Sequence, residues 1–203
     1  MKINLRQLGK KYNNEWIFKN ITLELSLGNH YVILGGNGSG KSTLLQTISG
    51  FQIQSEGNLE YMIDGKSVSV ENIFKHISIA SPYMELIEDF TLQELIDYQA
   101  KFKAFSEKNI AEVMQLESAK NKAIKYYSSG MKQRVKLGLA ILSNSPILLL
   151  DEPLSNIDKN GAEWYGNMIQ KYSSNRIIIV CSNNQKEEFE FCSESILMEN
   201  YKG

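Results

Sequence analysis

The spacing of hydrophobic residues changes along the chain, and it separates expected strands from expected helices. Residues 21–25, Ile-Thr-Leu-Glu-Leu, alternate apolar and polar positions, which predicts a half-buried strand. Short, mainly apolar runs further along are typical of strands buried on both faces of a parallel sheet. Residues 57–70 predict a hairpin with its tight turn at Asp64-Gly65. The other predicted strands are 31–34, 147–150, 176–181 and 195–198.

Apolar residues three or four positions apart predict helices in most of the remaining segments. Thr91 and Glu94 have the spacing of a capping box, which opens a helix that runs to about residue 102. The second half of the chain alternates strand and helix, and this alternation predicts an α/β fold with a mostly parallel sheet. The other predicted helices are 42–49, 109–117, 130–142, 159–172 and a short acidic one at 185–191.

Composition narrows the class of protein. The 203 residues are enough for one domain with a substantial core, and we expect a single domain over residues 1–203. A net charge of −1 gives no electrostatic reason to expect nucleic-acid binding. Cys181 and Cys192 have no Cys-x-x-Cys or metal-ligand spacing, which favours reduced thiols in a cytosolic protein. We expect neither a signal peptide nor a membrane span, since no run approaches the ~18 apolar residues that a span requires.

A glycine-rich loop carries the most specific chemistry. Residues 35–42 read Gly-Gly-Asn-Gly-Ser-Gly-Lys-Ser and match the phosphate-binding P-loop pattern, between a predicted strand and a predicted helix. Lys41 would contact the outer phosphates, and the Ser42 hydroxyl suits a phosphate-bound Mg²⁺. The alternative is a glycine-rich turn in another α/β protein. The expected phosphate-binding residues are Gly35, Gly36, Asn37, Gly38, Ser39, Gly40, Lys41, Ser42 and Thr43.

Two acidic residues follow the apolar strand at 147–150. Asp151 would lie at the carboxyl end of that strand, where a carboxylate can hold the Mg²⁺ that bridges nucleotide phosphates. Glu152 would lie beside the phosphates and could polarise an attacking water as a general base. The alternative is that Asp151 is the N-cap of the next helix.

Residues 127–134, Tyr-Ser-Ser-Gly-Met-Lys-Gln-Arg, lie between these motifs and resemble the signature sequence of ATP-binding-cassette (ABC) ATPases. Ser128, Ser129 and Gly130 would hold the phosphate of an ATP bound to another subunit, since they open a helix. Ser128 as an ordinary helix cap is the alternative. The resemblance covers about residues 1–198. It implies a P-loop NTPase core with an N-terminal antiparallel β-subdomain and an inserted helical subdomain at about 91–145.

Two further segments resemble parts of the same family. Tyr12 is placed where the family has an aromatic ring that stacks on adenine, and a ring offers a flat apolar face to a base. Packing of Tyr12 or Trp16 under the small sheet is the alternative. Residues 154–158 resemble the D-loop, which contacts the partner subunit's site.

Two positions depart from the family pattern. Pro82 replaces the glutamine that contacts Mg²⁺ and water, and Ser81 or Glu85 could substitute for it. Asn183 replaces the switch histidine; its amide can donate a hydrogen bond to the γ-phosphate, but it cannot take up a proton or become charged. The candidate catalytic residues are therefore Glu152, Lys41 and Asn183. ATP binding with slow turnover is the expectation.

The resemblance implies an ATPase subunit, with ATP and Mg²⁺ as cofactors, that powers a membrane transporter. Two copies, or one copy and a paralogous ATPase subunit, would close head to tail around ATP. A separate transmembrane permease subunit would be the membrane partner, and the chain would be peripheral on the cytoplasmic face of the cell membrane. One alternative is a regulatory module that binds nucleotide without hydrolysing it. A cassette acting on DNA or ribosomes is a third reading, but the chain has no long heptad run, no second P-loop and no basic net charge.

Overall fold

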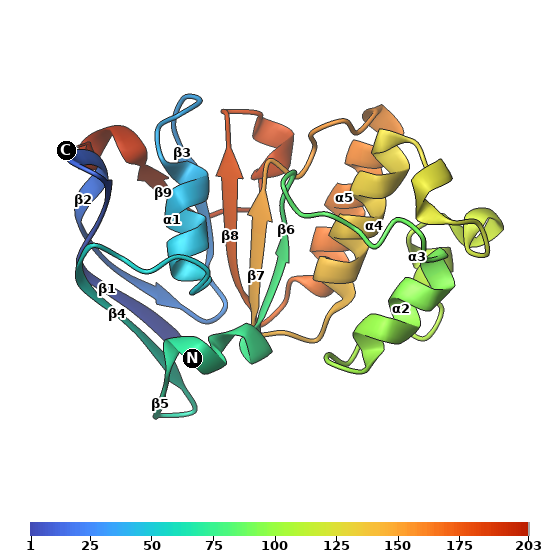
Figure 1. Cartoon of the computed structure of the whole chain (residues 1–203), viewed down its shortest axis with the longest axis horizontal. Helices are drawn as coiled ribbons and strands as arrows, with labels where there is room; N and C mark the ends of the chain where they lie inside the picture. The colour runs from blue at the N-terminus through green and yellow to red at the C-terminus, as the bar shows by residue number, and fades with distance from the viewer. Residues whose placement is uncertain (203) are drawn as a thin grey trace.

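The computed structural model describes residues 1–202 and contains two β-sheets (Figure 1). The antiparallel sheet has the order β2-β1-β4-β5, and the parallel sheet has the order β6-β7-β8-β3-β9. The strands of the antiparallel sheet are β1 (Lys2–Tyr12), β2 (Glu15–Ser26), β4 (Glu56–Ile63) and β5 (Lys66–Val68). Those of the parallel sheet are β3 (His30–Leu34), β6 (Ile77–Ala80), β7 (Ile147–Asp151), β8 (Ile177–Ser182) and β9 (Glu194–Leu197).

Helices cover both faces of the parallel sheet. Figure 1 shows α1 in front of the sheet and α4 and α5 beside it, with α2 and α3 further out. The α-helices are α1 (Lys41–Ile48), α2 (Leu92–Ala100), α3 (Ile110–Val113), α4 (Ser129–Leu142) and α5 (Lys159–Tyr172). Short 3₁₀ turns are η1 (Val70–His76), η2 (Glu117–Ala119), η3 (Ile124–Tyr126), η4 (Lys186–Glu188) and η5 (Met198–Tyr201).

Strand β7 shows how the layers are joined. All five of its residues are buried and the first four are apolar, so the strand packs on both faces. Leu148 and Leu150 pack in a core cluster with residues of α4 and α5. Ile147 and Leu149 belong to a second cluster, which includes α1 and the antiparallel sheet. The parallel sheet is thus the middle layer. Residues at the carboxyl ends of its strands lie between the two outer layers.

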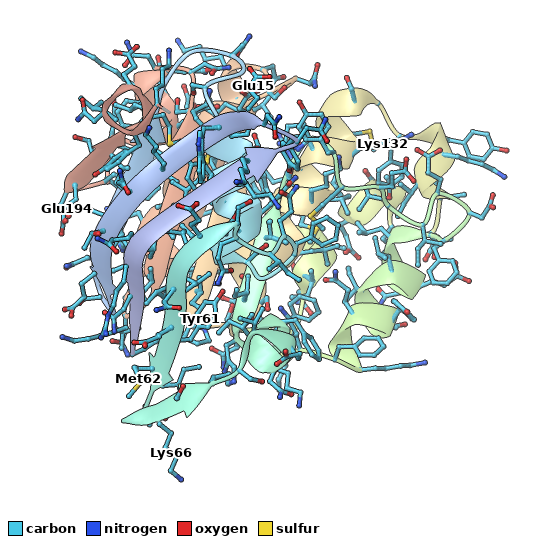
Figure 2. All side chains as sticks on the ribbon, turned by 60° about the vertical axis from the view of Figure 1, so that its left-hand side comes forward. Glu15, Tyr61, Met62, Lys66, Lys132 and Glu194 are labelled. Carbon is cyan, nitrogen blue, oxygen red and sulfur yellow. The ribbon has the colours of Figure 1, made fainter. Side chains whose placement is uncertain are left out.

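The antiparallel sheet holds the α1 layer in place. Tyr61 of β4 is fully buried, and its hydroxyl donates a 2.8 Å hydrogen bond to the carbonyl of Ile48 at the end of α1. Figure 2 faces this curved sheet, with Lys66 projecting from β5. The predicted turn is confirmed, since Asp64 and Gly65 have φ values of 51° and 76°, and positive φ at both positions is what a two-residue hairpin turn needs.

The structure corrects two predicted helices. The helix expected over 109–117 comprises only Ile110–Val113, and Gln115 has a φ of 58°, which a helix cannot contain. The acidic helix expected over 185–191 is a single 3₁₀ turn at Lys186–Glu188. Strand β6 was not predicted, although Ile77-Ser-Ile-Ala alternates apolar and small residues, because four residues are too short for a firm periodicity.

The helical middle of the chain packs on the parallel sheet. Buried residues of α2, α3 and α4 share one core cluster with β7 and β8. The capping box that opens α2 is present, since Thr91 accepts from the Glu94 backbone N–H and the Glu94 carboxylate accepts from that of Thr91. That residues 91–145 form a subdomain of their own stays a prediction.

Candidate nucleotide-binding site

The glycine-rich loop adopts a conformation that other residues would resist. Gly38 and Gly40 have φ values of 75° and 97°, in the left-handed region that side chains with a Cβ rarely adopt. Gly40 is the N-cap of α1, and a Cβ added there would lie 2.6 Å from the Ile17 side chain. A Cβ on Gly35 would collide with the Ser39 side chain. The loop is therefore tightly folded against its surroundings, and glycine is required at these positions.

A cavity of about 430 Å³ opens where this loop meets the N-terminus of α1. Residues 37–43 line it, together with Ile17 of β2, Tyr83 and Glu152. The first turn of α1 carries no acidic side chain, so its free N–H groups and its dipole favour an anion. The sequence did not indicate Ile17 or Tyr83, because only the packing of distant segments brings them to this cavity.

Lys41 is almost completely buried beside the loop. Its ammonium group donates to the carbonyl oxygens of Gly35, at 2.8 Å, and Gly36, at 3.1 Å. A third bond goes to the side-chain oxygen of Asn183, at 2.5 Å. Lys41 therefore places a positive charge at the loop, as a phosphate site requires.

Asp151 ends strand β7 and is 2% exposed. One carboxylate oxygen accepts from the Ser81 hydroxyl at 3.4 Å, and the other, Oδ1, has no partner in the protein. Burial raises the pKa of this carboxyl group, while the hydroxyl groups of Ser42 and Ser81 act in the opposite direction. The interpretation of Asp151 as a helix N-cap is wrong, because the next helix is α5 and its N-cap is Asp158.

Unpartnered polar atoms are concentrated at this site. Within residues 1–202, three buried side-chain polar atoms lack a hydrogen bond, and two of them are Ser39 Oγ and Asp151 Oδ1. Buried polar groups without partners are costly, and a bound ion or phosphate is a common reason for them. The oxygen groups of Asp151 and Ser42 are of the kind that Mg²⁺ prefers, and these two residues would be its protein ligands. Across the same residues no group of three acidic, histidine or cysteine side chains could hold a metal alone, so nucleotide and water would complete the coordination.

Glu152 follows Asp151 with a φ of 45°, and this turn in the backbone carries it to the cavity at the P-loop. The Asn183 amide donates to the Glu152 carboxylate at 2.7 Å. Asn183 comes directly after β8, which neighbours β7 in the sheet. The structure thus brings Lys41, Glu152 and Asn183 into one connected group.

The signature residues face a different cavity. Ser128 is the N-cap of α4 and accepts from the Met131 N–H at 3.2 Å, and Ser129 begins the helix. Ser128 and Gly130 line a cavity of about 500 Å³ together with Asn156 and Asp158, and this cavity shares no lining residue with the one at the P-loop. A single chain therefore does not bring its signature residues to its own P-loop.

Tyr12 lies near the end of β1 and is 45% exposed. Its hydroxyl bonds the Gln52 side chain, and the Lys10 ammonium lies 5.0 Å from the centre of its ring. Tyr12 is not buried under the small sheet, and it is not among the residues that line the P-loop cavity. Its role in stacking on adenine stays a prediction.

The loop after β6 contains the first departure from the family pattern. Ser81 is buried beside Asp151, whereas Glu85 is exposed. Of the two residues considered as substitutes for the missing glutamine, Ser81 is therefore the one near the site. Lys136 of α4 donates to the carbonyl oxygens of Ser81 and Pro82, at 3.4 and 3.0 Å, and fixes the loop from the helical side.

Glu188 is a further residue that sequence reasoning missed. It is 3% exposed, and its carboxylate accepts from the Leu154 N–H at 3.1 Å, so it holds the segment that follows Glu152. Burial raises the pKa of Glu188. In the sequence it is one of three nearly consecutive glutamates, at 187, 188 and 190, and nothing in that run marks it as the buried one.

Comparison with known proteins identifies the family. A sequence profile described as ABC transporter matches residues 18–155, which is more than half of the chain. The sulfate/thiosulfate import ATP-binding protein of Mesostigma viride is 29% identical over 209 residues, covering 97% of this chain and 59% of that protein. The spermidine/putrescine import ATP-binding protein of Legionella pneumophila (strain Philadelphia 1) is 33% identical over 168 residues, covering 77% of this chain and 44% of that protein.

A solved structure agrees in fold. A dimeric ATP-binding cassette in a post-hydrolysis state, bound to ADP and phosphate, superposes with a TM-score of 0.80 at 23% identity, covering 96% of this chain and 93% of that one. The fold is that of a P-loop NTPase of the cassette class. The chain belongs to the ABC transporter family, and the predicted fold and family are confirmed. The chain spans roughly half the length of the curated relatives it matches. Among residues 1–202, every helix is too short or too polar to cross a bilayer.

Proposed function

We propose that this chain binds and hydrolyses MgATP and supplies the energy for a membrane transporter. The observation that carries the proposal is the cavity at the α1 N-terminus, which Lys41 and Glu152 both line. Asp151, the residue directly before Glu152, is buried and keeps an unpartnered carboxylate oxygen. Each group has a place in phosphoryl transfer. The two curated relatives described above are named as ATP-binding proteins of import systems, which supports the same proposal.

The residues divide the work of hydrolysis. Backbone N–H groups of the P-loop and Lys41 bind the phosphates, and Ser42 with Asp151 holds the metal. Mg²⁺, when bound, neutralises charge on the phosphate oxygens. Glu152 accepts the proton of the attacking water, because this residue lines the same cavity as the P-loop.

The separation of the two cavities supports a composite site. Ser128 and Gly130 start helix α4 on a surface away from their own P-loop, so their free N–H groups are available to the nucleotide of a second subunit. A second copy or a paralogous subunit would therefore close head to tail. The solved ATP-binding cassette of the same fold is also described as a dimer.

An apolar groove of about 700 Å³ supports docking of a separate permease subunit. It runs from the end of α1 over η1 and β6 to Ser81 and Asp151, and Phe51, Phe74 and Tyr83 are exposed along it. An exposed apolar surface of this kind is typical of a binding site for another protein. Because the groove reaches Asp151, an occupant would lie next to the proposed metal site. The chain would then be peripheral on the cytoplasmic face of the membrane.

Hydrolysis and dimer closure test this proposal together. Purified protein is expected to hydrolyse MgATP, and Glu152→Gln is expected to lower kcat at least ~10²-fold, because the base is lost while the phosphate-binding groups remain. The variant should accumulate as an ATP-bound dimer in light scattering. A Glu152→Gln protein that stays monomeric at saturating ATP would contradict the closure model, and unchanged hydrolysis would contradict the role of Glu152.

A regulatory module that binds nucleotide without turnover is the second candidate. Two residues favour it. Pro82 has no side-chain ligand where the family has a glutamine, and Asn183 cannot take up a proton where the family has a histidine. Tight MgATP binding with no hydrolysis, even with the permease present, would support this candidate over the first.

A further inference from the structure

The hydrogen bonds of Lys41 leave no donor for a phosphate. A lysine ammonium has three N–H donors, and in this structure they go to Gly35 O, Gly36 O and Asn183 Oδ1. Two of these acceptors are backbone atoms of the folded P-loop. The third belongs to an exposed side chain outside the P-loop, so the loop can keep its fold when that bond is lost. Asn183 is therefore the partner that a bound nucleotide would displace.

Asn183 holds Glu152 at the same time. Its Nδ2 donates to Glu152 Oε1 at 2.7 Å while its Oδ1 accepts from Lys41. An amide oxygen can only accept and an amide nitrogen can only donate, so a cation on one side and a carboxylate on the other fix a single orientation of the side chain. One neutral residue thus connects the phosphate-binding lysine to the proposed base.

We propose that Asn183 is a positioning residue with two roles: its amide oxygen competes with phosphate for Lys41, and its amide nitrogen directs Glu152 at the P-loop cavity. Without nucleotide, Asn183 occupies the third donor of Lys41 and competes with phosphate. When the β- and γ-phosphates take that donor, the amide oxygen is released and the amide nitrogen keeps Glu152 directed at the cavity. This inference rests on the proposed function, since it concerns the nucleotide site of an ATPase.

Two substitutions at this position separate positioning from simple structural support. Asn183→Ala removes both bonds, so Lys41 is free to bind phosphate but Glu152 is no longer held. Asn183→Asp keeps an oxygen on Lys41 and makes it anionic, so Lys41 is held more firmly, while the donor to Glu152 is lost. The two variants should therefore change nucleotide affinity in opposite directions.

The first measurement is the Kd for ADP in excess chelator, by titration calorimetry, with no metal and no turnover. Asn183→Ala is expected to bind ADP ~10-fold more tightly than wild type, and Asn183→Asp ~10-fold more weakly, since a hydrogen bond to a charged group is worth about this much. Asn184→Gly is the matched control, because Asn184 has a φ of 73° that glycine tolerates, and it should leave the Kd unchanged.

The second measurement separates kcat from KM in MgATP hydrolysis. Both Asn183→Ala and Asn183→Asp are expected to lower kcat ~10²-fold, because a misplaced base loses its alignment with water. Asn183→Gln retains an amide and should recover part of kcat. A residue with only a structural role would lower affinity in both variants and would show no rescue by glutamine.

The outcomes distinguish this inference from the proposed function. Equal ADP affinities, or weaker binding in both variants, would overturn the competition of Asn183 for Lys41 while leaving an active wild-type ATPase intact. Wild-type protein that binds neither ADP nor MgATP would overturn the proposed function and this inference with it.

Discussion

Gly40 shows how one residue determines the shape of the candidate site. Its φ of 97° turns the chain into α1, and the space where a Cβ would lie is filled by Ile17. Both requirements exclude every side chain. The P-loop pattern in the sequence already indicated this glycine, but not that β2 packs against it.

Gly40→Ala is expected to lower the free energy of unfolding by about 2 kcal/mol or more, because the left-handed backbone alone costs an alanine about 1–2 kcal/mol and the contact with Ile17 adds to it. Nucleotide binding should be lost. Urea unfolding measures the first effect and calorimetry with ATP the second.

Gly36→Ala is the matched control for stability, since Gly36 has no positive φ and a Cβ there would contact nothing within 4 Å. It should leave the unfolding free energy within about 0.5 kcal/mol of wild type. Equal losses in the two variants would contradict the argument from φ and packing.

At the scale of the elements, strands and helices bring the functional side chains of the candidate site together. Strand β7 carries Asp151 to the carboxyl edge of the parallel sheet, β8 carries Asn183 to the same edge, and α1 starts beside them at Lys41. Parallel strands end on one side of a sheet, so side chains that follow neighbouring strands meet there. The 3₁₀ turn η4 adds Glu188, which holds the backbone after β7.

Glu188→Gln should change how stability depends on pH. Burial raises the pKa of Glu188 in the folded protein above its ordinary value of 4.5, so the folded state binds the proton more tightly than the unfolded state. Its contribution to stability is complete below that value and is lost as the pH rises through the raised pKa. Glutamine does not titrate and keeps an acceptor for Leu154. The unfolding free energy of the variant relative to wild type should therefore rise as the pH increases from 5 to 7.5.

Urea unfolding at these two pH values measures the difference. Glu187→Gln at the exposed neighbouring position is the control, and it should leave the stability difference between the two pH values as in wild type. A Glu188→Gln protein whose relative stability does not change with pH would contradict a cost from burial of the charge.

At the scale of the whole molecule, three surfaces carry the proposed function. The cavity at Ser128 and Gly130 shares no lining residue with the P-loop cavity, whereas the apolar groove over β6 meets the P-loop cavity at Tyr83. Head-to-tail closure would join the P-loop cavity of one subunit to the cavity at Ser128 and Gly130 of another, which makes two composite sites in a symmetric dimer.

Complementation between two inactive variants tests this arrangement. Lys41→Ala removes the charge at the P-loop, and Gly130→Asp adds a negative charge and a side chain where a Cβ would lie 3.1 Å from Asn156 O. Each variant alone should hydrolyse little MgATP. In an equal mixture, half of the dimers are mixed and each mixed dimer has one intact site, so about a quarter of wild-type activity should return. A mixture that stays inactive would contradict composite sites.

Much of the site could be predicted because it is encoded in short contiguous segments. The P-loop at 35–42, the strand ending in Asp151 and the cap at Ser128 depend on local backbone geometry, which neighbouring residues determine. The capping box at Thr91 is confirmed for the same reason. The helix expected at 109–117 was wrong because its apolar residues also satisfy a shorter helix followed by a turn at Gln115.

The sequence by itself determined the fold class, the family and the chemical groups of the candidate site, since these rest on patterns within a few residues of one another. Only the tertiary structure decided that Asn183 bonds both Lys41 and Glu152, that Asp151 keeps an unpartnered oxygen, and that Glu188 is buried against Leu154. These contacts join residues far apart along the chain, and their existence depends on how strands and loops pack. The local pattern of apolar and polar residues does not predict that packing.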